Sequence, residues 1–157
     1  MAKQYWLMKT EPTVFSIDDL MEVKSEPWEG IRNYQVRNML RDDLKKGDLA
    51  LCYHSNSKPS GVAGVMEVVK EGYPDYFAWD KKSKYFDIKS DPENPRWFMV
   101  DVKFKEKFSR IVSLTELKEE NKLSEMKVVQ RGCRLSIMKI KKVEFDHIIK
   151  LSKKSVK

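Results

Sequence analysis

Alternating apolar and polar positions mark the strands of this chain. In residues 96–105, Phe98, Val100, Val102 and Phe104 recur at every second position, and Asp101, Lys103 and Lys105 occupy alternate positions. This period of two is typical of a half-buried strand. We therefore expect those four side chains to face a core. Further strands are predicted at 5–8, 48–54, 61–69 and, after a turn, within 130–137. The runs 48–54 and 61–69 are apolar on both faces, as in central strands, and form a hairpin or neighbouring strands.

Apolar residues repeat at about 3.6-residue spacing in the segments between these strands. Helices are predicted at 16–21, from residue 33 to the turn at 46–48, at 113–118 and at 143–151. Ser16, Asn33 and Ser113 are suitable N-caps, because their side-chain oxygens accept hydrogen bonds from the first turn. Loops are predicted at 24–29 and 55–60. Residues 71–95 are irregular but rich in aromatic residues, which predicts a packed excursion rather than a disordered linker.

These elements predict an α+β fold. Five or six strands with short helices, and without repeated strand–helix alternation, are typical of a compact β-barrel with antiparallel or mixed strands. At 157 residues the chain is long enough to bury a core without metal or disulfide support. We expect a single domain over residues 1–157, in which 152–157 form a basic C-terminal tail.

Charge and composition narrow the classes of partner. The net charge of +7 and the pI near 9.3 favour an anionic partner. The N-terminal apolar run is too short for a signal peptide or a membrane span, so we expect a soluble protein without membrane contact, cytoplasmic or, in a eukaryotic cell, nuclear. Two cysteines and two histidines lack metal-ligand spacing. We therefore expect reduced thiols, no metal and no cofactor.

Candidate catalytic groups are few. Cys52 and His54 lie two residues apart on one predicted strand, so their side chains share a face and a Cys–His pair is conceivable. An apolar strand more often holds a buried, inert thiol. The spacing of Glu11, Glu29 and Asp48 does not distinguish acid–base catalysis from caps and ion pairs. No phosphate-binding loop, zinc-protease motif or nucleophile elbow occurs in the sequence.

Polar and aromatic residues gather where predicted elements end. Residues 28–38 combine a Trp, two Arg and two Asn, a mixture that suits a planar polar ligand. The same residues also suit a buried Trp followed by a capped helix. Residues 9–12 and 53–56 follow two predicted strands. In a small barrel such ends can meet at one mouth, which is a common ligand site.

The chain resembles the EVE domain family in these three segments and beyond. The matching segments are 5–8, 9–12, 28–34, 53–56, 61–64, 73–75, 95–97, 100–102, 108–117 and 131–136. They run in the family's order from about residue 5 to about residue 151. The resemblance implies a PUA-like β-barrel flanked by short helices, similar to the YTH domains that hold a methylated adenine in an aromatic cage.

The resemblance also implies a function. A non-catalytic domain would bind a modified nucleobase that is flipped out of DNA, with RNA as the other nucleic acid to test, and would act as a monomer. A hydrolase or nuclease similar to the ASCH branch of PUA-like folds, using Cys52–His54 or Lys9–Glu11, is one alternative. A small protein-interaction module is the other.

The family motifs place a ligand site on specific positions of this sequence. The residues implied are Lys9, Thr10, Glu11, Trp28, Gly30, Arg32, Asn33, Tyr34, Tyr53, His54 and Ser55. Trp28 would form a stacking wall, Asn33 and Ser55 would meet the base edge, and Arg32 and Lys9 would contact phosphate or a carbonyl. Trp6 and Trp97 lie in apolar strands, so we predict that both belong to the core.

Overall fold

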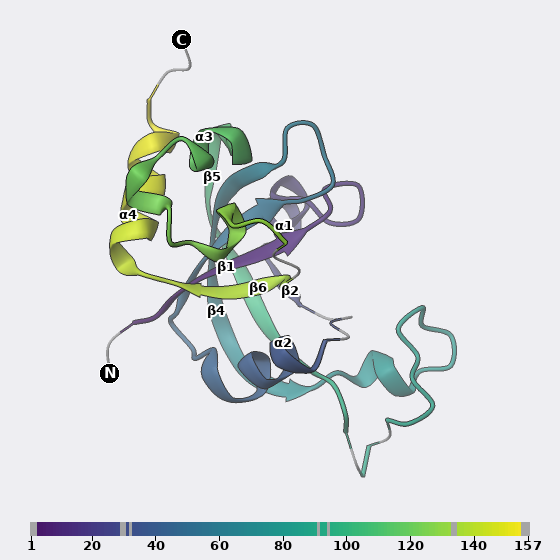
Figure 1. Cartoon of the computed structure of the whole chain (residues 1–157). Helices are drawn as coiled ribbons and strands as arrows, with labels where there is room; N and C mark the ends of the chain where they lie inside the picture. Colours follow the sequence, from purple (N-terminus) through teal and green to yellow (C-terminus); the bar gives the residue numbers. More distant parts are fainter. Residues whose placement is uncertain are drawn as a thin grey trace.

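The computed structural model describes residues 3–28, 31, 33–90, 92–93, 95–132 and 135–154. Within these residues it contains one six-stranded mixed sheet, in the order β2-β5-β4-β3-β1-β6 (Figure 1). The strands are β1 (Tyr5–Thr10), β2 (Ser25–Pro27), β3 (Leu49–His54), β4 (Gly61–Pro74), β5 (Phe98–Ser113) and β6 (Ile137–Ile140). β1 and β3 are parallel, and the other neighbours are antiparallel.

Short helices connect and cover the strands. They are α1 (Ile17–Val23), α2 (Tyr34–Asn38), α3 (Leu114–Lys118) and α4 (Lys142–Ser152), with π-helical η1 (Met39–Asp43) and 3₁₀ turns η2 (Tyr76–Trp79), η3 (Asn121–Leu123) and η4 (Lys127–Val129). The three predicted N-caps are confirmed: the side chains of Ser16, Asn33 and Ser113 each accept a hydrogen bond from a backbone N–H in the following turn. These bonds satisfy donors that a helix start otherwise leaves unpaired.

Both faces of the sheet are buried, by two separate apolar clusters. The first contains Trp6 and Met8 of β1 and packs against α1, α2 and η1, and the second contains Leu7 of the same strand and packs against α3 and α4. Successive side chains of a strand point to opposite faces, so β1 contributes to both clusters. Trp6 and Trp97 are buried, as predicted. The mixed sheet with helices on both faces agrees with the predicted α+β class.

Several predicted boundaries are wrong. Residues 24–29 were expected to be a loop, yet Ser25–Pro27 forms β2, which pairs with residues 101–103 of β5. The local sequence is a poor strand former, and the open edge of β5 decides its conformation. β4 continues to Pro74 and β5 to Ser113, because each strand extends the other's ladder. The last strand begins only at Ile137.

The segment 75–97, which we call the arm, projects from the sheet between β4 and β5 (Figure 1). Backbone hydrogen bonds hold its described residues: Asp75 N–H donates to the Trp97 carbonyl at 2.8 Å, and Asp87 N–H donates to the Ala78 carbonyl at 2.6 Å. The arm is therefore an ordered excursion, as its aromatic content predicted.

Candidate functional site

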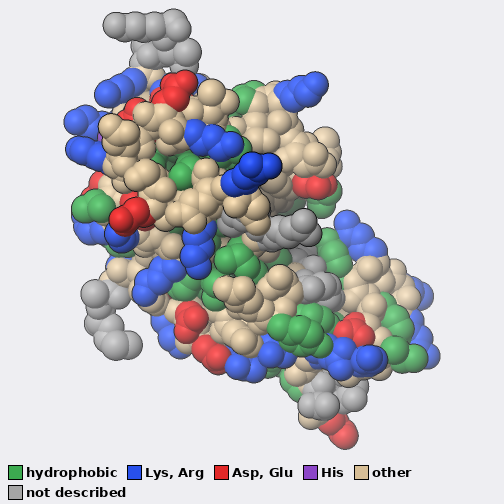
Figure 2. All heavy atoms as spheres, in the orientation of Figure 1, with side chains coloured by type: hydrophobic (Ala, Val, Ile, Leu, Met, Phe, Trp, Pro, Cys, Tyr) green, Lys and Arg blue, Asp and Glu red, His purple; other side chains and the backbone are tan. Residues whose placement is uncertain are grey.

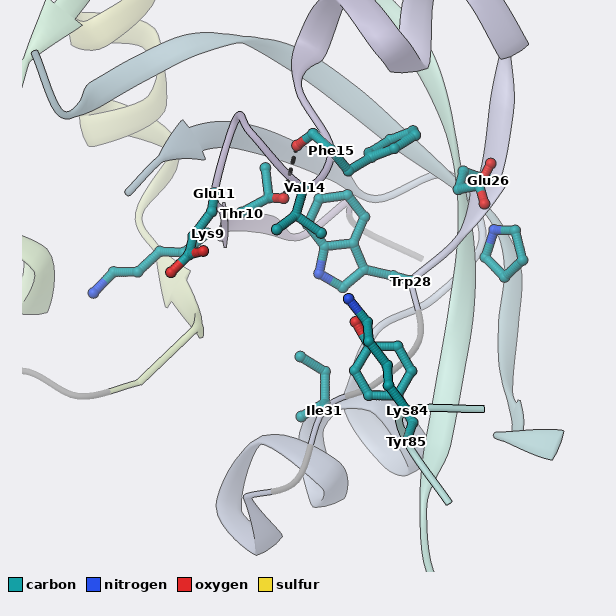
Figure 3. A pocket seen from close by; sticks show the side chains of 11 residues that line it. Lys9, Thr10, Glu11, Val14, Phe15, Glu26, Trp28, Ile31, Lys84 and Tyr85 are labelled. Carbon is teal, nitrogen blue, oxygen red and sulfur yellow. Dashed lines mark hydrogen bonds between the residues drawn. The ribbon is translucent and has the colours of Figure 1, made fainter. Parts of the chain in front are cut away.

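A pocket of about 560 Å³ opens between the end of β1, β2 and the arm (Figure 3). We call it the Trp28 pocket. Its lining residues are Lys9, Thr10, Glu11, Val14, Phe15, Glu26, Pro27, Trp28, Ile31, Lys84 and Tyr85. The volume lies within the range of about 300–1,000 Å³ that is common for small-ligand sites, and the mixture of apolar walls and a few polar groups is also typical.

Trp28 belongs both to the pocket wall and to the core. Its backbone N–H donates to the Val100 carbonyl at 2.7 Å, which prolongs the pairing of β2 with β5. The indole is 7% exposed and is a member of the first apolar cluster. Phe15 meets it edge to face, with ring centroids 6.5 Å apart. In Figure 3 the indole lies between Val14 and the pair Lys84 and Tyr85. The wall is therefore fixed before any ligand enters.

The end of β1 supplies polar groups on one side of the pocket. The Thr10 hydroxyl donates to the Phe15 carbonyl at 2.8 Å, which holds the loop that carries Val14 and Phe15. Glu11 accepts a hydrogen bond from the Asn56 amide at 3.3 Å. The Lys9 ammonium lies 5.8 Å from the centre of the Tyr53 ring. The bond from Asn56 occupies one of about four lone-pair positions of the Glu11 carboxylate. Glu11 can therefore accept further hydrogen bonds.

Opposing charges surround the pocket. Lys9 and Lys84 are cationic, and within the described residues neither forms an ion pair, whereas Glu11 and Glu26 are acidic. Burial, and then the nearby charge of Asp101, raise the pKa of Glu26. A carboxyl group with a raised pKa accepts a proton more readily and favours a cationic or proton-donating partner.

The structure brings four of the predicted site residues to this pocket: Lys9, Thr10, Glu11 and Trp28. Gly30 and Arg32, also predicted, lie outside the described residues. Sequence reasoning missed Val14, Phe15, Glu26, Pro27, Ile31, Lys84 and Tyr85, which also line it. Lys84 and Tyr85 come from the arm, and their only sequence signal was the density of aromatic residues there.

The other predicted residues have different positions. Tyr34 is 52% exposed and stacks on Trp97, with ring centroids 4.9 Å apart and planes inclined by 25°. Tyr53 is buried in the second apolar cluster, on the opposite face of the sheet from Trp28. The backbone N–H of Ser55 donates to the Thr10 carbonyl at 2.9 Å. None of these three residues lines the Trp28 pocket.

Asn33 borders a second, polar groove of about 400 Å³. We call it the Arg131 groove, and it is lined by Asn33, Gln35, Lys127, Gln130, Arg131, Gly132 and Leu135. Lys127 and Arg131 are exposed and form no ion pair within the described part of the chain. Residue 31 lines the pocket and residue 33 lines the groove, so both sites flank one segment.

The conceivable Cys52–His54 pair has unfavourable chemistry. Burial raises the pKa of the Cys52 thiol to about 12, so the nucleophilic thiolate is scarce at neutral pH. His54 Nε2 accepts a hydrogen bond from the Ile17 backbone N–H at 3.1 Å, and burial lowers the pKa of this imidazole. His54 therefore supports the start of α1. Among the described residues, no three His, Cys, Asp or Glu side chains gather as a metal site would require.

A mixed sheet between two helical layers, with a pocket beside the ends of β1 and β2, agrees with the PUA-like fold that the family resemblance implies. The family model of the EVE domain matches residues 4–151, and the chain belongs to the EVE domain family. The predicted resemblance and fold class are thereby confirmed.

Relatives of known sequence or structure support the assignment to this family. A Schizosaccharomyces pombe protein, C21.03c, is 42% identical over 166 residues, which cover 96% of this chain and 69% of that protein. Human thymocyte nuclear protein 1 is 40% identical over 172 residues, which cover 96% of this chain and 74% of that protein. A crystal structure of human THYN1 in complex with DNA containing 5-methylcytosine has a TM-score of 0.90 and 39% identity, covering 98% of this chain and 100% of that chain.

The described residues contain no helix with the length and apolar content needed to cross a bilayer.

Proposed function

We propose that this protein is a non-catalytic reader that binds DNA carrying a modified base and holds that base in the Trp28 pocket. The observation that carries the proposal is the fixed indole wall beside cationic and carboxylate side chains in a pocket of about 560 Å³. The human relative crystallised with DNA containing 5-methylcytosine supports the choice of DNA and of a methylated base.

The energetics of an extruded base agree with such a wall. Flipping a base out of a duplex costs a few kcal/mol in lost pairing and stacking. Stacking on an aromatic side chain returns about 1–3 kcal/mol per base. Because Trp28 is already held by the core and by its hydrogen bond to Val100, little further ordering is needed on binding.

The polar groups favour a base with an exocyclic amine. Carboxylates accept hydrogen bonds from the amino group of cytosine, and Glu11 and Glu26 both line the pocket. Val14 and Ile31 add apolar surface suited to a methyl group. Lys84 suits a phosphate beside the base, and Lys9, whose ammonium extends away from Trp28 and lies near Tyr53 (Figure 3), suits a phosphate farther along the strand. Such contacts position the strand without reading its sequence.

The test compares two replacements of the wall. Trp28→Phe keeps an aromatic face, whereas Trp28→Leu keeps apolar bulk without it. Fluorescence polarisation with oligonucleotides containing 5-methylcytosine or cytosine should show binding about 5- to 150-fold weaker for Trp28→Leu, with a smaller loss for Trp28→Phe. Circular dichroism and thermal denaturation check that both variants remain folded.

An exposed position provides a second variant that does not disturb the core. Glu11→Ala should reduce the preference for the methylated cytosine strand over an otherwise identical thymine strand. Unchanged affinity in folded Trp28→Leu, together with unchanged preference in Glu11→Ala, would refute the proposed site. Failure of the wild-type protein to bind any DNA or RNA oligonucleotide at low salt would instead favour the interaction-module hypothesis.

A further inference from the structure

The arm exposes apolar side chains immediately beside the Trp28 pocket. Lys84 and Tyr85 line the pocket, and the next residues expose Phe86 by 39% and Ile88 by 85%. Three residues of chain span at most about 11 Å, so Ile88 lies within roughly three base-pair steps of the pocket wall, since the rise is about 3.4 Å per step. At this exposure the Ile88 side chain buries little surface within the fold and is available to a partner.

Ile88 is presented by an ordered backbone. The preceding residue, Asp87, accepts a hydrogen bond from the Trp97 indole N–H at 2.6 Å, and its carboxylate lies 3.7 Å from the Arg96 guanidinium. The Asp87 carboxylate also accepts from the backbone N–H of Lys89 at 3.0 Å. Ile88 therefore lies between Asp87, whose carboxylate is held by Trp97 and Arg96, and Lys89, whose backbone N–H donates to that carboxylate.

The root of the arm, where Arg96 and Trp97 lead into β5, contacts α2. Trp97 stacks on Tyr34, whose ring centre lies 4.9 Å from the Arg37 guanidinium. Arg37 Nη1 also donates to the Arg96 carbonyl at 3.1 Å. α2 also contributes Val36 to the apolar cluster that contains Trp28, so the same helix contacts the arm and belongs to the core behind the pocket wall.

Basic and acidic residues balance over the whole arm, but residues 81–89 contain four lysines and one aspartate, a local charge that suits a polyanion. Lys81, Lys82, Lys84 and Lys89 are exposed, and among the described residues none of them forms an ion pair. Figure 2 shows basic side chains along the outer edge of the lobe at lower right, which is the arm, beside hydrophobic ones. Apolar residues flanked by lysines combine backbone attraction with a surface that base pairs can contact.

We propose that the arm inserts Ile88 into the base stack of duplex DNA beside the flipped base and fills the space that this base leaves. Apolar wedges that partly unstack a base step are a general device of DNA-binding proteins. The inference rests on the proposed function, because only a base held in the Trp28 pocket leaves such a space. This role of the arm applies to duplex DNA, because a single strand has no paired stack for Ile88 to enter.

The test compares Ile88→Ala with Val143→Ala, which also truncates a β-branched apolar side chain, at a 70% exposed position on α4. The probes are a duplex with one central 5-methylcytosine, the same modified strand alone, and the duplex with an abasic site opposite the modified base. Ile88→Ala should bind the intact duplex about tenfold more weakly and the single strand with unchanged affinity. The abasic duplex should show a smaller loss, since its stack is already interrupted. Val143→Ala should match the wild type throughout.

Equal losses on duplex and single strand, or no loss on the duplex, would overturn the wedge. The proposed function is judged separately by the wild-type protein: preference for the modified single strand over the unmodified one supports it whatever Ile88→Ala does. If the wild type lacks that preference and also fails to bind the modified duplex, both proposals are refuted.

Discussion

His54 offers a sharp test of how the pocket loop is supported. The imidazole is 8% exposed at the end of β3, and its Nε2 accepts the hydrogen bond from the Ile17 backbone N–H at 3.1 Å. Ile17 is the first residue of α1, so this N–H is one that a helix leaves unpaired. His54→Phe keeps a ring of similar size but removes the acceptor. His54→Gln restores an acceptor on a flexible side chain.

The expected cost follows from one buried donor that loses its partner. Such a donor costs about 1–3 kcal/mol. For a chain of this size, each kcal/mol lowers the melting temperature by about 2–4 °C, which predicts a loss of about 2–12 °C for His54→Phe. His54→Gln should lose less. His147→Phe is the control: it breaks a partly buried contact with Glu120, whose carboxylate keeps access to water, so its loss should be smaller than that of His54→Phe.

The pH dependence provides a second, independent readout. Burial lowers the pKa of His54 below the ordinary value of 6.5, and the charges of Asp18 and Asp19 offset only part of this effect. The unfolded chain therefore binds more protons once the pH falls below 6.5, and stability declines from there toward the folded-state pKa. His54→Phe lacks this contribution, so its deficit should shrink between about pH 7.5 and about pH 5. Melting curves equal to those of the wild type at neutral pH, or a deficit that does not change with pH, would refute the reasoning.

Two further predictions concern charge at the candidate sites. Burial and Asp101 raise the pKa of Glu26 above 4.5, so the folded chain holds this proton more tightly and stability is lost as the pH rises through the folded-state value. Glu26→Gln should therefore gain stability over the wild type in urea denaturation as the pH rises from about 4 to about 8, and a difference that is constant across this range would contradict it. Replacing Lys127 and Arg131 together by Ala should reduce the slope of log Kd against log salt by about 2 on duplex DNA without changing base preference. An unchanged slope would exclude the Arg131 groove from phosphate contact.

The elements that the sequence predicts are those whose signals are local. The alternation around Val100 and Val102 depends only on the pleat of one strand, and the caps at Ser16 and Asn33 bond to residues within one turn. β2 has no such signal. Ser25–Pro27 is a strand because β5 leaves an edge open to it, which is a property of the tertiary structure.

The residues of the candidate site likewise divide into those with a local sequence signal and those without one. Lys9, Glu11 and Trp28 stand at element ends and in motifs that the EVE family resemblance singles out, so the sequence alone identifies them. Glu26 and Lys84 reach the pocket through β2 and the arm. Neither residue has a spacing that relates it to Trp28, because the contacts that bring them together are long-range.

Residues 28–38 connect the two proposals physically. At one end, Trp28 is held by the core and faces the pocket. At the other end, Tyr34 and Arg37 hold the root of the arm through Trp97 and the Arg96 carbonyl. A base wall and a wedge must keep a fixed separation if one is to fill the space that the other's ligand leaves, and α2 contributes to it, because Val36 belongs to the apolar cluster that contains Trp28 while Tyr34 and Arg37 hold the arm. Loosening the Tyr34–Trp97 stack should therefore weaken duplex binding while leaving the pocket's affinity for a single modified strand intact.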